Sequence, residues 1–394
     1  MLSVTNKSTG SSFSGKGIYL DNAASVPCPE KYLRAFMEYS LRYPGNQESM
    51  AFHGAASSRA VREAGEKILD ALGAPQKEYS IHFCNSGTEG AGSAVQALCM
   101  ASGRSFPEGG RIVTTPLEHA ALLRALERAA ERYGCTLVFA PVSRSGLCVE
   151  SFEELLDEKT VAVAVHHVES QTGSILDLCR LRQMMEERSP RALLLADTVQ
   201  SAGKLELDLQ KIRPDLFLIS GQKLAVPSSG AVICRAPVGK CMEQLRGKDH
   251  LYGRSTPGAI LTLAEALAEQ LRDRTEIYHH VSGLCTLLEQ ELQKHALPFR
   301  RTLSPEKSSP FIYHCMCTPY QGAILTRALY RYGVSVAPGS ACESETPSGS
   351  AVLSSMGYSR AECFCGLRIS FSGANTAAEI CSAAESLSLC VADY

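Results

Sequence analysis

The chain has 394 residues, of which 45% are hydrophobic and 20% charged, and its formal net charge is −2. A chain of this length buries a sizeable core and is expected to divide into about two or three domains. The near-neutral balance gives no electrostatic basis for binding nucleic acid. No apolar run approaches the roughly 18 residues that a membrane-spanning helix needs, so no membrane partner is expected.

The 16 cysteines bear on the compartment in which the protein works. Segment 1–17 has no apolar stretch and is not expected to be a secretory signal. Neither Cys-x-x-Cys nor a Cys/His cluster with zinc-ligand spacing occurs, so no metal site is predicted. We therefore expect a cytoplasmic protein with mostly buried thiols, because disulfides do not persist in a reducing compartment.

From about residue 80, short apolar runs alternate with helical patterns. The predicted strands are 81–84, 111–114, 136–140, 161–166, 193–196, 216–219 and 231–234. Helices are predicted between them, for example at 117–132 and 177–187. This alternation predicts an α/β fold with a mostly parallel sheet that is covered on both faces. Such sheets bind ligands at the carboxyl ends of their strands.

After Gly258 the pattern changes to that of a second unit. Residues 259–297 form an almost unbroken helical pattern, which predicts one connecting helix. The elements expected beyond it are a strand at 311–317, a helix at 322–332, a Ser/Gly/Pro-rich loop at 338–350, a strand at 367–371 and a final helix. The final helix opens with Thr376-Ala-Ala-Glu379, a capping box. We predict a large domain at 18–258 and a smaller α+β domain at 259–394, with segment 1–17 either packed on the small domain or mobile.

Two strand ends in the predicted sheet suit a charged ligand. In Asn85-Ser-Gly-Thr-Glu-Gly90, Gly87 allows close backbone approach, Thr88 offers a hydroxyl and the helix N-terminus presents N–H groups, which together suit a phosphate. The alternative is an ordinary turn in which Thr88 caps the helix. Asp197 ends a buried strand, where a carboxylate is costly unless it pairs with a positive group such as a protonated ring nitrogen. The alternative there is a cap of the next helix.

Lys223 and His119 also follow predicted strands. Lys223 stands in Ser220-Gly-Gln-Lys223, and a partly desolvated lysine can form an imine with a carbonyl. A surface lysine in a loop is the alternative. His119 is suited to stacking on a planar ring or carrying a proton, unless its role is merely structural.

Cys342 and Arg368 belong to the second unit. Pro338-Gly-Ser-Ala-Cys342 places a cysteine in a polar loop, and exposure favours reaction as a thiolate, although an incidental loop cysteine is the alternative. Arg368 begins a predicted strand and suits bidentate recognition of a carboxylate, unless its head reaches solvent. Phosphate turn, stacking histidine, ring-nitrogen aspartate and imine-forming lysine together describe a site for pyridoxal 5′-phosphate (PLP).

In this order the motifs resemble those of the class V aminotransferases, a family of PLP enzymes, and within it the cysteine desulfurases. The likeness extends from about Ile18 to Leu389. The matching segments are Tyr19-Leu-Asp-Asn-Ala-Ala24, Ser86-Gly-Thr-Glu89, Glu118-His119, Asp197-Thr-Val-Gln200, Ser-x-x-Lys223 and Arg254-Ser-Thr256-Pro. Gly339-Ser-Ala-Cys342 with Arg368-Ile-Ser370 is the most discriminating part, because it resembles desulfurases whose active cysteine lies in a long, flexible loop.

The resemblance implies a role for each matching residue. Lys223 would hold PLP, Asp197 would pair with the ring nitrogen, and Gln200 would contact the ring hydroxyl. His119 would stack on the ring and move protons. The phosphate would be held by Gly87, Thr88, Ser220 and Gln222, with Thr256 from a partner chain of a homodimer. Arg368, Asn22 and Ser170 would bind L-cysteine. Cys342 would take its sulfur as a persulfide destined for an acceptor protein, leaving L-alanine.

Two positions depart from the desulfurase pattern. Gln222 stands where desulfurases carry histidine before the imine lysine. Glu169-Ser170-Gln171-Thr172-Gly173 stands where they carry Asn-Asn-Glu before Thr-Gly, and it is more similar to the aminotransferase branch. We expect a PLP-dependent cysteine desulfurase. The alternatives are a class V aminotransferase, a selenocysteine lyase-type enzyme, or a degenerate binding partner that kept the fold.

Overall fold

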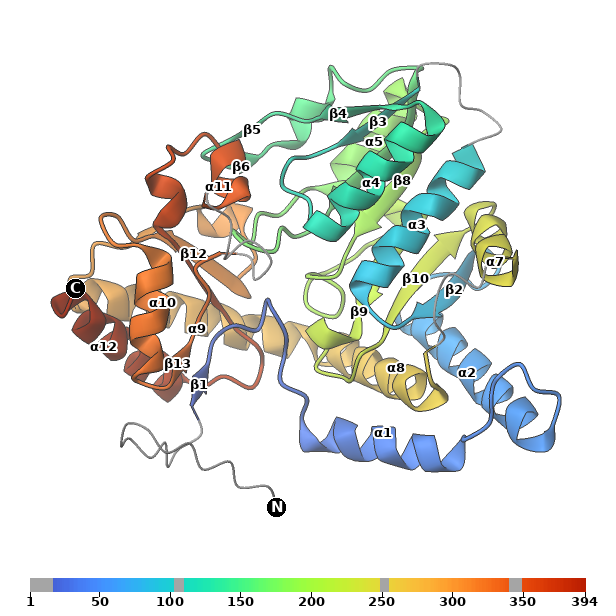
Figure 1. Ribbon diagram of the computed structural model, residues 1–394, viewed down its shortest axis with the longest axis horizontal. Coiled ribbons are helices and arrows are strands. Elements are labelled where there is room, and N and C mark those ends of the chain that lie inside the picture. The colour runs from blue at the N-terminus through green and yellow to red at the C-terminus, as the bar shows by residue number, and fades with distance from the viewer. Residues whose placement is uncertain (1–16, 103–109, 249–254, 340–348) are drawn as a thin grey trace.

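A seven-stranded sheet forms the centre of the computed structural model, which describes residues 17–102, 110–248, 255–339 and 349–394 (Figure 1). In spatial order its strands are β2 (Tyr79–Cys84), β10 (Gly230–Arg235), β9 (Leu216–Ser220), β8 (Leu193–Asp197), β7 (Thr160–His166), β3 (Arg111–Thr114) and β4 (Thr136–Phe139). Strands β9, β8, β7, β3 and β4 run parallel, while β10 is antiparallel to both its neighbours. The seven predicted strands and the mostly parallel sheet are therefore confirmed.

Helices cover both faces of this sheet. On one face lie α3 (Gly87–Ser102), α4 (Ala120–Tyr133) and α7 (Val238–Lys248); on the other lie α2 (Phe52–Ala71), α5 (Leu178–Arg188) and α8 (Pro257–Arg272). The middle of strand β7, residues 161–165, is apolar: Ala162 and Ala164 pack with the first set of helices, and Val163 and Val165 with the second. Successive side chains of a strand point to opposite faces, so a doubly covered strand reads as a continuous apolar run.

The single connecting helix predicted for 259–297 is wrong. The structure divides this segment into α8 and α9 (Arg274–Lys294), separated by Asp273, whose φ and ψ are −94° and 5°. The Asp273 carboxylate pairs with the Arg272 guanidinium at 2.8 Å and 2.9 Å. Helix α8 packs against α1 (Glu30–Arg42) and α2, whereas α9 packs against α12 (Ala377–Ala392). Aspartate tends to interrupt helices, and the break lets the two halves follow different neighbours.

The C-terminal elements form a second layered unit around an antiparallel sheet. Its strands are β11 (Arg300–Arg301), β12 (Ile312–Met316) and β14 (Gly366–Ser370), and its other helices are α10 (Gly322–Tyr330) and α11 (Ala351–Ser355). Short β1 (Ile18–Tyr19) pairs with β13 (Val334–Ser335), so the start of the described chain lies beside this unit (Figure 1). The capping box is confirmed, with Thr376 N–H donating to Glu379 at 2.8 Å. The domain limits 18–258 and 259–394 stay a prediction.

The smaller elements are α6 (Leu209–Ile212) and a hairpin of β5 (Val142–Ser143) and β6 (Gly146–Leu147). Within the described ranges, no helix combines the length and the apolar character needed to cross a membrane.

Candidate active site

A cavity of about 250 Å³ opens where β7, β8 and β9 end, beside the N-terminus of α3. The predicted site residues that line it are Gly87, Thr88, His119, Ser170, Asp197, Gln200, Ser220, Gln222, Lys223 and Arg368. Parallel strands bring their carboxyl ends to one edge, which explains why residues from separate strand–helix units meet here.

The N-terminus of α3 forms one wall of the cavity. The Ser86 hydroxyl accepts the Glu89 N–H at 3.1 Å, so Ser86 caps the helix and Thr88 does not have that role. A Cβ atom added to Gly87 would lie 3.2 Å from the Ser220 Cβ, which shows how closely α3 approaches the end of β9. The first N–H groups of α3 therefore face a narrow space without a side chain between them, an arrangement suited to a phosphate.

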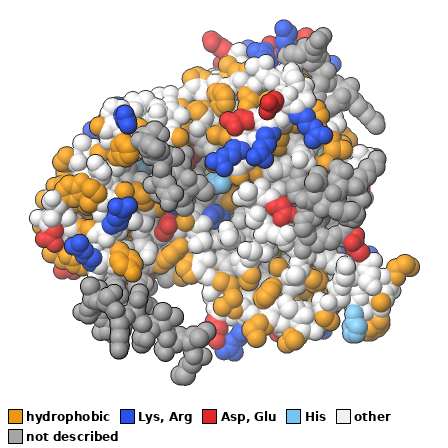
Figure 2. Space-filling view, viewed as in Figure 1, with side chains coloured by type: hydrophobic (Ala, Val, Ile, Leu, Met, Phe, Trp, Pro, Cys, Tyr) orange, Lys and Arg blue, Asp and Glu red, His pale blue; other side chains and the backbone are white. Residues whose placement is uncertain are grey.

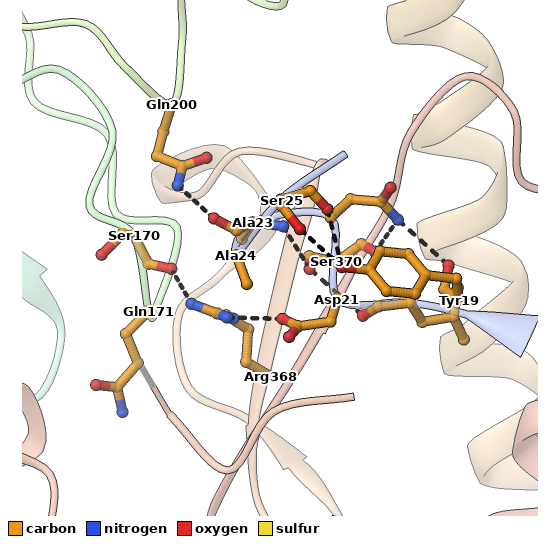
Figure 3. A network of polar contacts seen from close by, with 12 residues as sticks. Tyr19, Asp21, Ala23, Ala24, Ser25, Ser170, Gln171, Gln200, Arg368 and Ser370 are labelled. Carbon is orange, nitrogen blue, oxygen red and sulfur yellow. Dashed lines mark hydrogen bonds and ion pairs between the residues drawn. The ribbon is translucent and has the colours of Figure 1, made fainter. Parts of the chain in front are cut away.

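Asp197 lies at the end of β8 and accepts the Val199 N–H at 2.9 Å. Burial raises the pKa of this carboxyl group, and the charge of Glu118 raises it further. Gln200 donates to the Ala23 carbonyl at 2.9 Å, while its Oε1 atom is buried without a partner (Figure 3). The cavity is thus lined by a buried acid, Asp197, that a cation would stabilise, and by the Gln200 amide, whose oxygen can still accept a hydrogen bond.

Lys223 occupies a short 3-10 turn, Gly221–Lys223, directly after β9. Its ammonium donates to the Ala24 carbonyl, and the neighbouring Gln222 carbonyl accepts the Val26 N–H at 2.9 Å. The segment that follows β1 is thereby held against the lysine turn. This contact places Ala23 and Ala24 in the cavity wall opposite the α3 terminus.

Lys204 is a buried amine near the half-buried Lys223, and sequence reasoning missed it. Burial lowers its pKa to about 7, with a smaller contribution from Lys223. Its Nζ atom lies 5.7 Å from the Phe311 ring centroid, in a cavity of about 450 Å³ that Lys223 also lines.

The protonation of Lys204 should make stability depend on pH. Since its folded pKa of about 7 lies below the ordinary 10.5, the unfolded chain binds more protons between those values, and stability rises with pH there. We expect the free energy of unfolding to rise more steeply from pH 7 to 9 in the wild type than in Lys204→Met, by up to about 1.4 kcal/mol per pH unit. Urea titrations measure this, with exposed Lys211→Met as the control. Equal slopes for wild type and Lys204→Met would contradict the assignment.

Arg368 is buried on β14, with only 1% of its surface exposed, so its head does not reach solvent. Its guanidinium donates to the Ser170 carbonyl at 2.8 Å and to the Asp21 carboxylate at 2.7 Å (Figure 3). The Nε–H group is buried without a partner. A fixed guanidinium with spare donors at the cavity edge suits a bidentate anion.

Three predicted residues do not line this cavity. Asn22 is buried, donates to the Ser370 carbonyl at 2.8 Å and lines the second cavity. Thr256 is exposed at the N-terminus of α8, where its hydroxyl accepts the Ala259 N–H at 3.4 Å. Cys342 lies outside the described residues.

Gln171 lies beside residues on both sides of the segment that carries Cys342, and sequence reasoning missed this role. Its Oε1 atom accepts the Ser350 hydroxyl at 2.8 Å. A Cβ atom added to Gly339 would lie 3.3 Å from its Nε2 atom. Gln171 directly follows Ser170, whose carbonyl holds Arg368, so one turn connects the arginine with the residues flanking 340–348.

Glu118 and His166 form a buried pair beside Asp197. The Glu118 Oε1 atom accepts both the Thr115 hydroxyl and the His166 Nδ1–H, each at 2.7 Å. His119, which follows Glu118, is exposed and uses its own Nδ1 atom to cap α4 at 3.2 Å from the Ala121 nitrogen. The helix predicted at 117–132 therefore starts at Ala120. In the sequence, the position of His166 at the end of an apolar run could have indicated this pair.

A profile of the family Aminotransferase class-V matches residues 18–382, and the chain belongs to that family. It is 29% identical over 370 residues to a cysteine desulfurase of Trichormus azollae, covering 92% of this chain and 90% of that one. It is 26% identical over 383 residues to the cysteine desulfurase IscS of Methanosarcina thermophila, covering 93% and 89% of the two chains.

Solved structures share the fold. A NifS-like protein is 22% identical, with a TM-score of 0.84 and coverage of 96% of this chain and 100% of that one. The cysteine desulfurase CsdA of Escherichia coli, in an S-sulfonic acid form, is 21% identical, with a TM-score of 0.78 and coverage of 96% and 95%. Both structures therefore match the fold over nearly the whole of this chain.

Proposed function

We propose that this protein is a PLP-dependent cysteine desulfurase, which converts L-cysteine to L-alanine and takes the sulfur onto Cys342 as a persulfide. The observation that carries the proposal is that Lys223, Asp197 and Arg368 line one cavity although they come from separate elements, namely the turn after β9, the end of β8 and the middle of β14. The desulfurase names of the relatives support the choice of reaction within the family. An acceptor protein then takes the sulfur from Cys342.

The described residues fit PLP. The N-terminus of α3, Thr88 and Ser220 would hold the phosphate, since Gly87 leaves room for close approach. Asp197 would gain the cation that its raised pKa calls for, namely the protonated ring nitrogen. Gln200 has an unused amide oxygen, His119 lies at the mouth of the cavity and Lys223 carries the amine. PLP bound here supplies an electron sink for the substrate carbons.

The chain's own residues supply proton transfer, orientation and the sulfur acceptor. Arg368 orients the substrate through its carboxylate, and the Lys223 amine removes the α-proton. The Cys342 thiolate attacks the substrate sulfur: the S–S bond forms as the Cβ–S bond breaks, and its electron pair stays on the carbon fragment. That fragment takes up protons, for which His119 is a carrier, and leaves as L-alanine.

Turnover of L-cysteine tests this proposal. With dithiothreitol to reduce the persulfide, we expect equal amounts of sulfide and L-alanine. Alanine formation from an amino donor and a keto acid, without sulfide, would identify an aminotransferase. Preference for selenocysteine would identify the lyase-type alternative. Absence of turnover with every substrate would favour the degenerate binding partner.

Arg368 should determine recognition of the substrate carboxylate. Arg368→Lys keeps a positive charge beside Asp21 but loses the planar fork, so we expect kcat/KM for L-cysteine to fall about 100-fold, mainly through KM. Cysteamine, which lacks the carboxylate, serves as the comparison substrate, and its kcat/KM should change little. If both substrates lose activity equally while PLP stays bound, Arg368 has another role.

We also propose a homodimer in which Thr256 of each chain reaches the phosphate of the other. Leu33, Met37 and Leu41 form an apolar stripe on α1, with 45%, 63% and 81% of their surfaces exposed. Met50 and Phe52 extend it, at 99% and 82%. Figure 2 shows hydrophobic side chains gathered over α1 at the lower edge of the molecule. Because α1 packs against α8, the stripe lies near the helix that Thr256 begins.

The double variant Met37→Glu/Leu41→Glu should be monomeric, because two carboxylates cannot be buried unpaired in an apolar interface. Light scattering after size-exclusion chromatography measures the mass. Leu389→Glu, at a 46% exposed position on α12, is the control and should leave the dimer intact. A monomeric wild type would contradict the proposal.

A further inference from the structure

The Glu118–His166 pair has no part in the chemistry described above, yet both of its side chains are buried. The exposed fractions of the two side chains are 0% for Glu118 and 4% for His166. Each keeps one atom without a partner: Oε2 of Glu118 and Nε2 of His166 are buried and make no hydrogen bond. A half-satisfied buried polar pair is costly, and such groups are common at functional sites.

His166 faces the cofactor cavity and is the register partner of Asp197. Strands β7 and β8 run parallel there, with His166 aligned to Asp197 at their carboxyl ends. Both residues line the cavity, whereas Glu118 lies behind the imidazole and does not. From the protein interior towards the cavity, the Glu118 carboxylate therefore comes first, the His166 imidazole second and the space beside Asp197 last.

The charges around this pair decide its protonation state. The titratable groups near His166 are Glu118 and His119 before α4, His167 and Glu169 after β7, and Asp197 on β8, with Lys223 and Arg368 lining the same cavity. Burial favours the neutral ring, but Glu118, with help from Glu169 and Asp197, raises the pKa of His166 above its ordinary value. Burial lowers the pKa of His167 to about 4, so His167 stays neutral. The 2.7 Å contact with Glu118 thus favours the imidazolium form of His166, and an imidazolium–carboxylate pair carries no net charge.

Without that imidazolium, two carboxylates would share one poorly solvated corner. A nearby like charge disfavours ionisation, so Asp197 would hold a proton more readily. The charge of Glu118 raises the pKa of Asp197, while His119 and His166 lower it. An Asp197 that retains its proton cannot pair with a protonated ring nitrogen.

We propose that the Glu118–His166 pair is a positioning element for Asp197: its imidazolium offsets the charge of Glu118 and keeps the Asp197 carboxylate ionised for the ring nitrogen of the cofactor. This inference rests on the proposed PLP function. It assigns His166 no contact with the substrate and no proton transfer in the reaction.

The test is a pH titration of the visible absorbance of PLP bound to the purified protein. His166→Gln keeps a donor for Glu118 but loses the positive charge, so the pair acquires a net charge of −1. A negative charge raises the proton affinity of the groups in the cavity. We expect the midpoint of the absorbance titration to move to higher pH by about one unit, a ten-fold change in proton affinity.

Glu118→Gln/His166→Gln is the matched control. It removes both charges, so the pair is neutral again and most of the shift should be reversed. If the pair served only in packing, the absorbance titration should change more in the double variant than in the single one. If His166→Gln loses PLP but the double variant retains it, cofactor retention depends on the charge of the pair. That result also supports the inference.

Two results would overturn the inference. One is an unchanged midpoint in His166→Gln that retains PLP. The other is equal loss of PLP from the single and the double variant. Failure of the proposed function is distinguishable, because in that case the wild type itself would bind no PLP.

Discussion

Replacing Lys223 with alanine is expected to lower the turnover of L-cysteine by about 10⁴-fold, because in the proposed mechanism its amine both attaches the cofactor and removes the α-proton. Lys223 stands on a short turn that is held by the segment after β1. A rigid support places the amine for proton transfer, and water cannot replace it with equal geometry. Sulfide and alanine assays measure the loss.

Attachment can be mapped independently of activity. Borohydride reduction of the wild-type holoenzyme, followed by peptide mass spectrometry, should find PLP on Lys223. The nearby Lys204 is the informative alternative, because burial lowers its pKa to about 7 and so makes an uncharged amine available at neutral pH. An adduct on Lys204 in the wild type would contradict the assignment. Lys211→Ala, at an exposed position, controls for loss of a lysine elsewhere.

Replacing Cys342 with alanine should abolish sulfide formation while PLP stays bound, because the thiolate that receives the sulfur is gone. The described cysteines offer few substitutes. Nine of these fifteen are buried, and only Cys148 is exposed. Burial raises the pKa of thiols such as Cys99, to about 12, and Cys285, to about 11, which keeps them protonated and unreactive.

Cys148→Ala is the matched control, since it removes the exposed thiol on the described part of the chain and should leave turnover unchanged. Mass spectrometry of the wild type, stopped before reductant is added, should find the persulfide on Cys342. Intact activity of Cys342→Ala would assign the protein to the aminotransferase or lyase-type alternatives. Loss of activity in both variants would point to general damage by cysteine substitution.

Local sequence patterns were sufficient to predict the sheet and many of the residues that line the cavity. Apolar runs bounded by turns predicted seven strands, because strands covered on both faces contain few polar residues. The rule that ligands bind at the carboxyl ends of parallel strands brought Thr88, Asp197 and Lys223 to one place, and all three line the cavity. These features depend on sequence neighbours within one strand and its following turn.

Contacts between distant segments could not be predicted in this way. Arg368 was open to two interpretations until Asp21 and Ser170 were found on its guanidinium. The Glu118–His166 pair joins the segment before α4 to the end of β7. The sequence around either residue does not indicate which residue it contacts. The helical pattern continues across Asp273, and the break there became apparent only from the different packing partners of α8 and α9.

The ion pair between Arg368 and Asp21 closes a loop of 347 residues, nearly the whole chain. Closing so long a loop carries a large entropic cost, which local contacts formed earlier reduce by shortening the effective loop. The Arg368 guanidinium therefore takes its place at the cavity only where the segment after β1 and strand β14 have come together. The carboxylate binding proposed for Arg368 thus depends on a contact between distant segments of the chain and not on the seven-stranded sheet alone.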